Sequence, residues 1–247
     1  MSALLNIEGI TGGYSVQKPV LHDVSFTVHT NEIVGLIGLN GAGKSTTIKH
    51  VLGLMEPSKG SIALNGRTFV EDPEAYRQAL SFIPETPILY EELNLWEHLQ
   101  LAAMAYGIDE DVFERRAQEL LKTFRMEKMK RWFPSHFSKG MRQKVMIMCA
   151  FLVDPELYVV DEPFVGLDPV AIQSLLDRMT EMKANGAGIL MSTHILTTAE
   201  KYCDRFVLLH DGVLKMKGTL EELQQQAGMP GQSLDDIYIA VTKEGSE

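Results

Sequence analysis

The sequence predicts an α/β fold with a mostly parallel sheet, an antiparallel β flank and an inserted α-helical lobe. Two mostly apolar runs, at residues 32–37 and 157–160, lack polar alternation, as expected of strands that are buried on both faces of a parallel sheet. A helical pattern follows each of them within a few residues. Residues 92–135 show helical periodicity and no convincing strand, so we place the helical lobe there.

The size and composition of the chain favour a single globular domain. It has 247 residues, of which 45% are hydrophobic and 23% are charged, values typical of a globular protein with a sizeable core. The net charge of −10 argues against nucleic acid as the main partner. Cys149 and Cys203 lack CxxC spacing, which predicts two buried, reduced thiols in a cytosolic chain.

No targeting or membrane-spanning segment is expected. The N-terminal sequence lacks the basic region of a signal peptide. No window approaches the roughly 18 consecutive apolar residues that a bilayer-spanning helix needs. Any role at a membrane would therefore require a partner protein.

The N-terminal part of the chain predicts the antiparallel flank and the first helix of the core. Apolar residues alternate with polar ones at 5–7 and 24–28, as in half-buried strands. The helix after the first buried strand is expected at residues 46–54, and Pro57-Ser-Lys-Gly60 should break the chain.

Three helices are expected in and beside the lobe. Apolar residues between 93 and 103 fall on one helical stripe, and a second helix is predicted at 110–124. A third helix should begin at Ser138, acting as N-cap, and continue to Phe151.

The C-terminal part returns to the sheet. Asp168 should cap a helix that starts at Pro169 and ends near Asn185-Gly186. Strands are expected at residues 188–192 and 206–209.

The last elements are a hairpin and one helix. Asp211-Gly212 separates two apolar runs and predicts a tight hairpin turn. Thr219 and Glu222 have capping-box spacing for a last helix. We expect a single domain over residues 1–247. Its parts are the core and antiparallel flank at about 1–87 and 154–220, the helical lobe at about 88–153 and a short C-terminal tail at 221–247.

A glycine-rich loop after the first buried strand predicts a nucleotide site. Gly38-Leu-Asn-Gly-Ala-Gly-Lys-Ser45 fits the P-loop pattern G-x-x-x-x-G-K-[ST], in which backbone N–H groups surround phosphate oxygens. Lys44 would reach the β- and γ-phosphates, Ser45 would bind Mg²⁺ and Thr46 would contact the α-phosphate. The alternative is a glycine-rich turn that merely precedes a helix. The candidate contacts are Gly38, Asn40, Gly41, Ala42, Gly43, Lys44, Ser45 and Thr46.

Two acids at the end of the second buried strand predict the catalytic part of the same site. Asp161 can hold Mg²⁺ through water, and Glu162 can act as general base on the attacking water. A solvated pair of acids at a strand end is the alternative. His194 follows another apolar strand, so it should lie beside the phosphates, although a lone histidine is often structural. Lys44, Glu162 and His194 are thus the catalytic candidates.

The order of these motifs resembles that of ABC-transporter ATPase domains over residues 3–220. The matching positions are Tyr14, residues 38–46, Glu85, Ser138 to Met141, Asp161-Glu162, residues 166–168 and His194. Within that family, "FSKGMRQKV" and the C-terminal "SLDDIYIAVTKEGSE" are similar to the ATPase subunits of Ecs-type bacterial transporters. The resemblance implies the ABC ATPase fold, built on a P-loop NTPase core, and ATP hydrolysis with Mg²⁺.

The resemblance also implies roles for further residues. Tyr14 corresponds to the aromatic side chain that stacks on adenine, and His194 to the switch histidine. Glu85 stands where the family usually has a glutamine. A carboxylate there can still accept a hydrogen bond from water or ligate Mg²⁺, so Glu85 is a metal candidate. It also adds negative charge beside the phosphates. The alternatives are a flank-packing aromatic for Tyr14 and a surface acid for Glu85.

Residues 138–141 correspond to the family's signature motif, which contacts ATP bound to the other protomer. Ser138 and Gly140 match the usual motif, whereas Lys139 replaces a glycine and Met141 replaces a glutamine. Asp168 would lie where the two ATP sites of a head-to-tail dimer meet. The second ATPase subunit is expected to be another copy of the chain, and a related second chain is the alternative.

The remaining partner implied by the resemblance is an integral membrane subunit of the Ecs type. The chain would then act at the cytoplasmic face of the cell membrane. Candidate docking residues are Leu89, Tyr90, Leu93, Leu95 and Trp96, although a buried helix–helix seam would explain several of them. Two rivals are a soluble ABC ATPase that remodels nucleic acid or the ribosome, and a P-loop kinase or GTPase. The acidic charge opposes the first, and the absence of an Asn-Lys-x-Asp motif opposes a GTPase.

Overall fold

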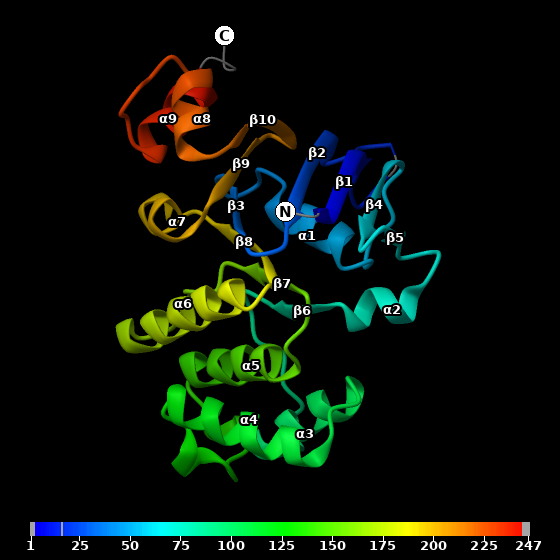
Figure 1. Cartoon of the computed structure of the whole chain (residues 1–247), viewed down its shortest axis with the longest axis vertical. Coiled ribbons are helices and arrows are strands. Elements are labelled where there is room, and N and C mark those ends of the chain that lie inside the picture. Colours follow the sequence, from blue (N-terminus) through cyan, green and yellow to red (C-terminus); the bar gives the residue numbers. More distant parts are fainter. Residues whose placement is uncertain (1–2, 16, 244–247) are drawn as a thin grey trace.

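A single ten-stranded sheet runs through the described part of the chain. The computed structural model describes residues 3–15 and 17–243. The strand order is β5-β4-β1-β2-β10-β9-β3-β8-β7-β6. Figure 1 shows an elongated molecule with a helical lobe at one end and the C-terminal helices at the other. The predicted α/β class, with a mixed sheet and an inserted helical lobe, is confirmed.

The parallel core carries the strands that were predicted to be buried on both faces. β3 (Ile33–Ile37) lies between β8 (Gly188–Thr193) and β9 (Arg205–His210), and β7 (Leu157–Asp161) and β6 (Leu80–Ile83) extend the sheet. Every residue of β3, β7 and β8 is buried. Their carboxyl ends lie level, because Ile37 pairs with Thr193 and Asp161 with Ser192. The segments that follow these strands therefore meet at one edge of the sheet.

The antiparallel flank contains two strands that were not predicted. β1 (Ala3–Gly12) pairs with β2 (Leu21–His29) as expected, and also with β4 (Lys59–Leu64), which pairs with β5 (Arg67–Thr68). Asn65 and Gly66, at φ +53° and +75°, form the turn between these last two strands. This Asn-Gly pair between apolar runs was the available signal for the hairpin.

The predicted late hairpin joins the flank to the parallel core. β10 (Val213–Gly218) pairs antiparallel with β9 after the turn at Asp211-Gly212. It also meets β2 at one parallel bridge, between Val213 and His22. The N-terminal strands and the late hairpin belong to the flank as predicted, but β4 and β5 extend it beyond the prediction.

The helical lobe consists of α3 (Leu95–Ala105), α4 (Glu110–Thr123) and the first part of α5 (Lys139–Val153), with short 3₁₀ turns at Glu127–Met129 and Pro134–His136. Its core is apolar and partly aromatic, and the ring centroids of Trp96 and Phe113 are 4.8 Å apart. Leu95 and Trp96 are buried in it. The prediction that these two residues face a docking partner is therefore wrong, and they belong to the helix–helix seam.

Glycine and capping residues mark the ends of the core helices. α1 (Lys44–Val51) starts and ends before the predicted range of 46–54, and Gly53, at φ +69°, follows its end. α6 (Pro169–Ala184) starts after its predicted N-cap, Asp168. The helix α2 (Pro73–Gln78), which precedes β6, was not predicted.

The C-terminal segment holds two helices where the sequence predicted one. Thr219 and Glu222 form the expected capping box of α8 (Leu220–Gln226). A further helix, α9 (Leu234–Lys243), packs with α7 (Leu196–Tyr202) against β3 and β9. Leu234, Ile237 and Tyr238 supply its buried face, at helical spacing that the sequence analysis did not use. Residues 1, 2, 16 and 244–247 of the predicted domain lie outside the described residues.

Membrane-spanning capacity can be judged for the helices that the structure describes. Among residues 3–15 and 17–243, none of the helices combines the length and the apolarity needed to cross a bilayer.

Candidate functional site

A cavity of about 480 Å³ lies at the N-terminus of α1, beside the carboxyl ends of the parallel strands. This is the edge of a parallel sheet at which α/β proteins commonly bind ligands. Five segments distant in sequence contribute to it. Its lining residues are Tyr14, Val20, Leu39, Asn40, Gly41, Gly43, Lys44, Ser45, Thr46, Glu85, Glu162 and His194. The structure therefore brings together the predicted glycine-rich loop, the strand-end acid, the histidine, Tyr14 and Glu85.

The glycine-rich loop bends in a way that only glycine tolerates easily. Gly41 and Gly43 have φ of +86° and +105°. A Cβ on Gly38 would lie 2.8 Å from the carbonyl oxygen of Leu209 in β9, so that position admits no side chain without movement. No side chain caps the N-terminus of α1 within the described structure. The first N–H groups of the helix are thus open to an anion, which the helix dipole also favours.

Lys44 is buried at the base of this loop. Its Nζ donates a hydrogen bond to the Gly38 carbonyl at 2.7 Å and a longer one to the Leu39 carbonyl at 3.4 Å. It also lies 3.2 Å from Oε1 of Glu162. The ammonium group therefore has one opposite charge beside it and two backbone dipoles that hold the loop closed.

Glu162 is the centre of the charged part of the cavity. Its backbone has φ +44°, an uncommon conformation for a residue with a side chain. Oε1 faces Lys44, and Oε2 lies 2.8 Å from Nδ1 of His194. Its N–H donates to Ser192, with the hydroxyl oxygen at 3.1 Å and the carbonyl oxygen at 3.2 Å. The predicted catalytic residues are thus in direct contact with one another.

Asp161, the last residue of β7, directly precedes Glu162 and is the predicted metal ligand of this strand end. It is buried, and its Oδ1 accepts a hydrogen bond from the Ser192 hydroxyl at 2.5 Å. Ser45 and Glu85 are exposed and line the cavity. All three side chains offer the hard oxygen ligands that Mg²⁺ prefers. Within residues 3–15 and 17–243, no group of three or more His, Cys, Asp or Glu side chains is arranged to hold a metal ion.

Tyr14 stands at the rim of the cavity with 70% of its surface exposed. Its hydroxyl accepts a hydrogen bond from Nζ of Lys49 at 2.9 Å, and the same nitrogen lies 4.9 Å from the ring centroid. This hydrogen bond lowers the pKa of the Tyr14 phenol. The sequence analysis did not single out Lys49, since nothing in the local sequence connects it with a residue of the flank.

The signature residues lie in a second group outside this cavity. Ser138 is exposed and caps α5, with Oγ accepting from the Met141 N–H at 3.3 Å. A Cβ on Gly140 would lie only 2.4 Å from the Gly166 carbonyl oxygen, so α5 begins in direct backbone contact with the loop before α6. The side chain of Lys139 is exposed, and Met141 packs partly into the lobe.

Asp168 belongs to the same second group. Its Oδ1 caps α6 by accepting the Ala171 N–H at 2.9 Å, and Oδ2 pairs with Nζ of Lys144 at 3.0 Å. The backbone hydrogen bond from Ala171 and then the bond from Lys144 lower the pKa of Asp168. Lys144, on α5, thereby ties Asp168 to the signature helix. It was not predicted, because a single lysine on a helix carries no local signal.

One buried amide connects the two groups. Gln143, on α5, is 1% exposed and donates from Nε2 to the Pro84 carbonyl at 2.8 Å. Pro84 directly precedes Glu85, which lines the first cavity. A polar residue within the apolar stretch of α5 was the only sequence signal for this contact.

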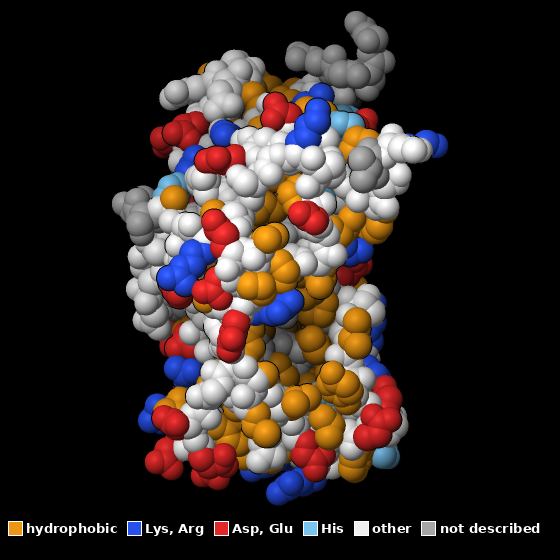
Figure 2. Space-filling model, turned by 90° about the vertical axis from the view of Figure 1, so that its right-hand side faces the viewer, with side chains coloured by type: hydrophobic (Ala, Val, Ile, Leu, Met, Phe, Trp, Pro, Cys, Tyr) orange, Lys and Arg blue, Asp and Glu red, His pale blue; other side chains and the backbone are white. Residues whose placement is uncertain are grey.

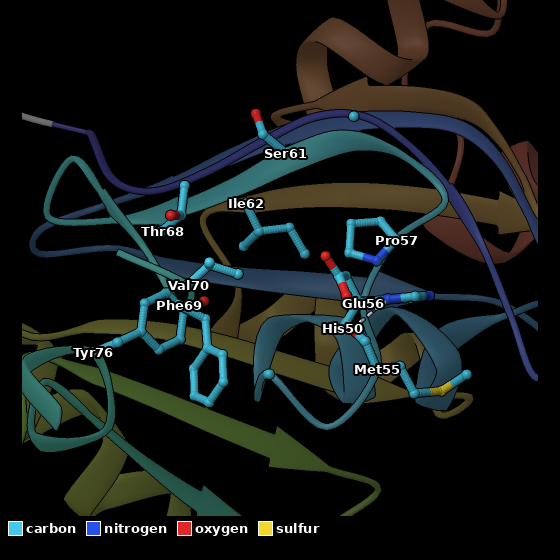
Figure 3. Close-up of a pocket in the computed structure, with 12 residues that line it drawn as sticks. His50, Met55, Glu56, Pro57, Ser61, Ile62, Thr68, Phe69, Val70 and Tyr76 are labelled. Atoms are coloured by element: carbon cyan, nitrogen blue, oxygen red, sulfur yellow. Dashed lines mark hydrogen bonds between the residues drawn. The ribbon is translucent and has the colours of Figure 1, made fainter. Parts of the chain in front are cut away.

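A second cavity, of about 360 Å³, lies at the opposite end of α1 (Figure 3). Ile62, Phe69, Val70 and Tyr76 form one wall, and the segment that carries Glu56 forms another. Among the residues that the structure describes, no lysine or arginine lines it. The C-terminal end of a helix dipole and an acidic side chain both disfavour phosphate, so this cavity does not suit a nucleotide.

The comparisons with known proteins agree with this geometry. The family described as ABC transporter matches residues 21–165, which include the glycine-rich loop, the signature residues and the acidic strand end. The chain is 63% identical, over 98% of both chains, to the ABC-type transporter ATP-binding protein EcsA of Bacillus subtilis (strain 168). The chain belongs to the ABC transporter ATP-binding family. It is the ATP-hydrolysing subunit of a bacterial ABC transporter, and the resemblance to Ecs-type subunits is confirmed.

Other relatives of this ABC ATPase support the same conclusion. It is 34% identical, over 90% of its length and 89% of the relative, to the ABC transporter ATP-binding protein NatA of Bacillus subtilis (strain 168). A solved structure described as the ATP-binding subunit of an ABC transporter has a TM-score of 0.94 and 59% identity, covering 97% of this chain and 99% of that one. The cbiO1 structure from Clostridium perfringens, described as part of the ABC transporter complex cbiONQ, has a TM-score of 0.76 at 22% identity and shares the fold.

Proposed function

We propose that two copies of this ABC ATPase close around two Mg-ATP molecules and drive an EcsB-like membrane permease. The single observation that carries the proposal is the division of the motifs into two groups. Lys44, Glu162 and His194 line one cavity, whereas Ser138 and Asp168 lie outside it. A chain with two separated halves of a phosphate site requires a second chain to complete it.

The first half site would bind the nucleotide triphosphate by its P-loop. The uncapped N-terminus of α1 and the Lys44 ammonium supply the positive potential, and Tyr14 at the rim would stack on adenine. Lys44 would exchange its carbonyl and Glu162 contacts for the β- and γ-phosphates. Ser45 and Asp161 would hold the magnesium ion, which offsets the negative charge of the phosphates, while Glu85 would add negative charge nearby without ligating the metal.

Hydrolysis would then use the carboxylate that Lys44 releases. Oε1 of Glu162 becomes free to accept a proton from a water molecule, whose oxygen attacks the γ-phosphorus while the bond to the ADP oxygen breaks. Oε2 stays on His194, whose ring is half exposed toward the cavity and can hydrogen-bond the γ-phosphate. The uncommon backbone conformation of Glu162 fixes this direction of its side chain.

The second half site would close over the ATP of the partner copy. Ser138 offers a hydroxyl at a helix N-terminus, and Gly140 brings backbone N–H groups near it. Three exposed apolar side chains stand next to motif residues, Leu39 in the P-loop, Val170 after Asp168 and Ile195 after His194. Burial of such side chains between two copies would support closure whenever the γ-phosphate bridges them.

The surface proposed for the membrane partner lies on the helical lobe. Figure 2 shows hydrophobic side chains gathered on the face that carries α3. Ile88, Tyr90 and Met104 are exposed by 80%, 62% and 78%. Of the predicted docking residues, Tyr90 is exposed, whereas Leu89 and Leu93 are half-buried and Leu89 packs against the core of the lobe. Ile88 is an addition. An amphipathic cytoplasmic helix of the permease would fit this surface, and would hold the subunit at the cytoplasmic face of the membrane.

Nucleotide binding is tested by replacing the P-loop lysine. Lys44→Ala should weaken the binding of ATP by roughly 10- to 100-fold, because a charged hydrogen bond contributes about 1.5–3 kcal/mol. Lys59→Ala, at an exposed position of β4, is the matched control. Equal affinities of wild type and Lys44→Ala, measured by titration calorimetry, would exclude this cavity as the site.

The membrane partner is tested by sedimentation. The wild-type subunit should sediment with membranes only when the permease is co-expressed. Ile88→Glu should abolish this, whereas Leu54→Glu, at an equally apolar exposed position near the end of α1, should not. Sedimentation without the permease, or equal loss in both variants, would contradict the proposed surface.

A further inference from the structure

A tyrosine from the C-terminal helix reaches the phosphate-binding loop. Tyr238, on α9, is 4% exposed. Its hydroxyl accepts a hydrogen bond from the Leu39 N–H at 3.0 Å and donates one to the Leu209 carbonyl at 3.3 Å. The hydroxyl thus links the start of the loop to β9, across segments that are distant in the sequence.

Leu39 depends on hydrogen bonds for its position. Its side chain is 59% exposed, so packing does little to hold it. Tyr238 binds its N–H group, and its carbonyl group accepts from the Ala42 N–H at 3.1 Å and, at 3.4 Å, from Nζ of Lys44. Burial raises the pKa of the Tyr238 phenol, which therefore stays protonated and able to donate to Leu209 near neutral pH. The peptide unit beside the Lys44 ammonium is consequently fixed from α9.

The same helix is also tied to the segment after His194. The N–H of Leu234, at the start of α9, donates to Oε2 of Glu200 in α7 at 2.8 Å. α7 begins two residues after His194, and its Ala199 is buried with Leu234 and Ile237 in one apolar cluster. A single C-terminal helix therefore contacts Leu39, which lines the nucleotide cavity, and also the helix that follows His194, another lining residue.

We propose that α9 positions the phosphate-binding loop, with Tyr238 as the positioning residue. The inference rests on the proposed nucleotide site at Lys44. Tyr238 touches neither nucleotide nor water in this scheme. It holds Leu39 so that the loop is already shaped for phosphate and the free energy of binding is not used to order it. The competing interpretation is a core tyrosine whose hydroxyl merely satisfies two buried polar groups.

The test removes the hydroxyl and keeps the ring. Tyr238→Phe should raise both the Kd for the fluorescent analogue mant-ATP and the KM for ATP by roughly 2- to 10-fold, as expected for one net hydrogen bond. The kcat should stay within about twofold, since the general base and the γ-phosphate contacts are unchanged. The matched control is Tyr106→Phe, which deletes a half-buried hydroxyl that donates to the Leu80 carbonyl at 2.7 Å, away from the loop.

A second variant keeps the inference testable if Tyr238→Phe folds poorly. Glu200→Ala removes the acceptor at the start of α9 and should raise the same KM to a smaller extent. A change confined to the melting temperature, equal in Tyr238→Phe and Tyr106→Phe, would overturn the inference. So would a fall in kcat at constant KM.

The outcome also separates this inference from the proposed site. If Lys44→Ala binds mant-ATP as tightly as wild type, the site is wrong and the role of Tyr238 falls with it. If Lys44→Ala loses binding while Tyr238→Phe and Glu200→Ala bind like wild type, only the positioning role is wrong.

Discussion

The two groups of motif residues differ in how far one chain completes them. Around Lys44 the cavity is walled on several sides, and charged groups are paired within it. Around Ser138 there is an exposed helix N-terminus whose neighbours, Gly166 and Asp168, fix its orientation without enclosing anything. Under the proposed function, the first half site would bind nucleotide alone, whereas the second would act only on a nucleotide carried by the partner copy.

The largest effect should come from the general base of the complete half. Glu162→Gln should reduce ATP turnover by about 10²- to 10⁴-fold, the usual contribution of a positioned base. Because ATP would bind without being cleaved, a dimer should accumulate with Mg-ATP. Phosphate release and gel filtration measure the two effects. A variant that stays monomeric with excess Mg-ATP and the permease present would argue against closure by two copies.

The next effect concerns the exposed half. Ser138→Ala should lower turnover by roughly 10- to 100-fold through a lost hydrogen bond to a charged phosphate, yet leave ATP binding to the monomer unchanged. It also removes a helix cap, as Thr219→Ala does at α8 by deleting the same kind of hydroxyl acceptor. Thr219→Ala is therefore the control for stability. A parallel loss of monomer affinity would show that the two halves are not separate.

A smaller effect should follow from crowding the contact between the two motif segments. Gly140→Ala places a Cβ against the Gly166 carbonyl, so the backbone must shift at a cost of about 1–3 kcal/mol of unfolding free energy. The ATP-dependent dimer should weaken while monomer binding of ATP persists. Thermal melting with and without Mg-ATP distinguishes the loss of monomer stability from the weakening of the ATP-dependent dimer. A charged residue at Gly140 would be a poorer test, because it clashes within its own chain before any partner arrives.

The smallest effect should come from replacing Glu85, which stands where the family usually has a glutamine. This carboxylate is exposed at the rim of the nucleotide cavity. Glu85→Gln removes one negative charge near the phosphates and should tighten Mg-ATP binding by at most about fivefold in this wet environment. Repeating the titration at high salt should shrink the difference. A weaker Mg-ATP complex in the variant would instead indicate that Glu85 ligates the metal.

The elements whose structure is determined by a short segment of sequence were predicted correctly. The doubly buried β3 and β7, the cap at Ser138 and the Asp211-Gly212 hairpin were all found from short segments. The strand edge at which the motifs meet followed from the buried strands preceding them. β6 and α2 were missed because short, weakly patterned segments acquire their structure from neighbours.

Contacts between distant segments could not be predicted in the same way. The local sequence around Leu95 and Trp96 fits a docking surface as well as a buried core. Only tertiary packing determines that both side chains are buried. The contact of Tyr238 with Leu39 joins residues 199 positions apart in the sequence, and the pairing of Glu162 with Lys44 accompanies an uncommon backbone angle at Glu162. Such features result from the assembled fold, so no window of sequence contains them.

The closed P-loop has a consequence for the speed of nucleotide entry. Lys44 is hydrogen-bonded to the Gly38 carbonyl, and Leu39 is held at its N–H group. The arrival of ATP therefore replaces one set of hydrogen bonds with another and does not require a disordered segment to become ordered. Entry is then limited by diffusion and by long-range charge. Since the chain carries a net charge of −10, it repels a polyanion at a distance. Raising the ionic strength should therefore speed the association of ATP even while it weakens the final complex.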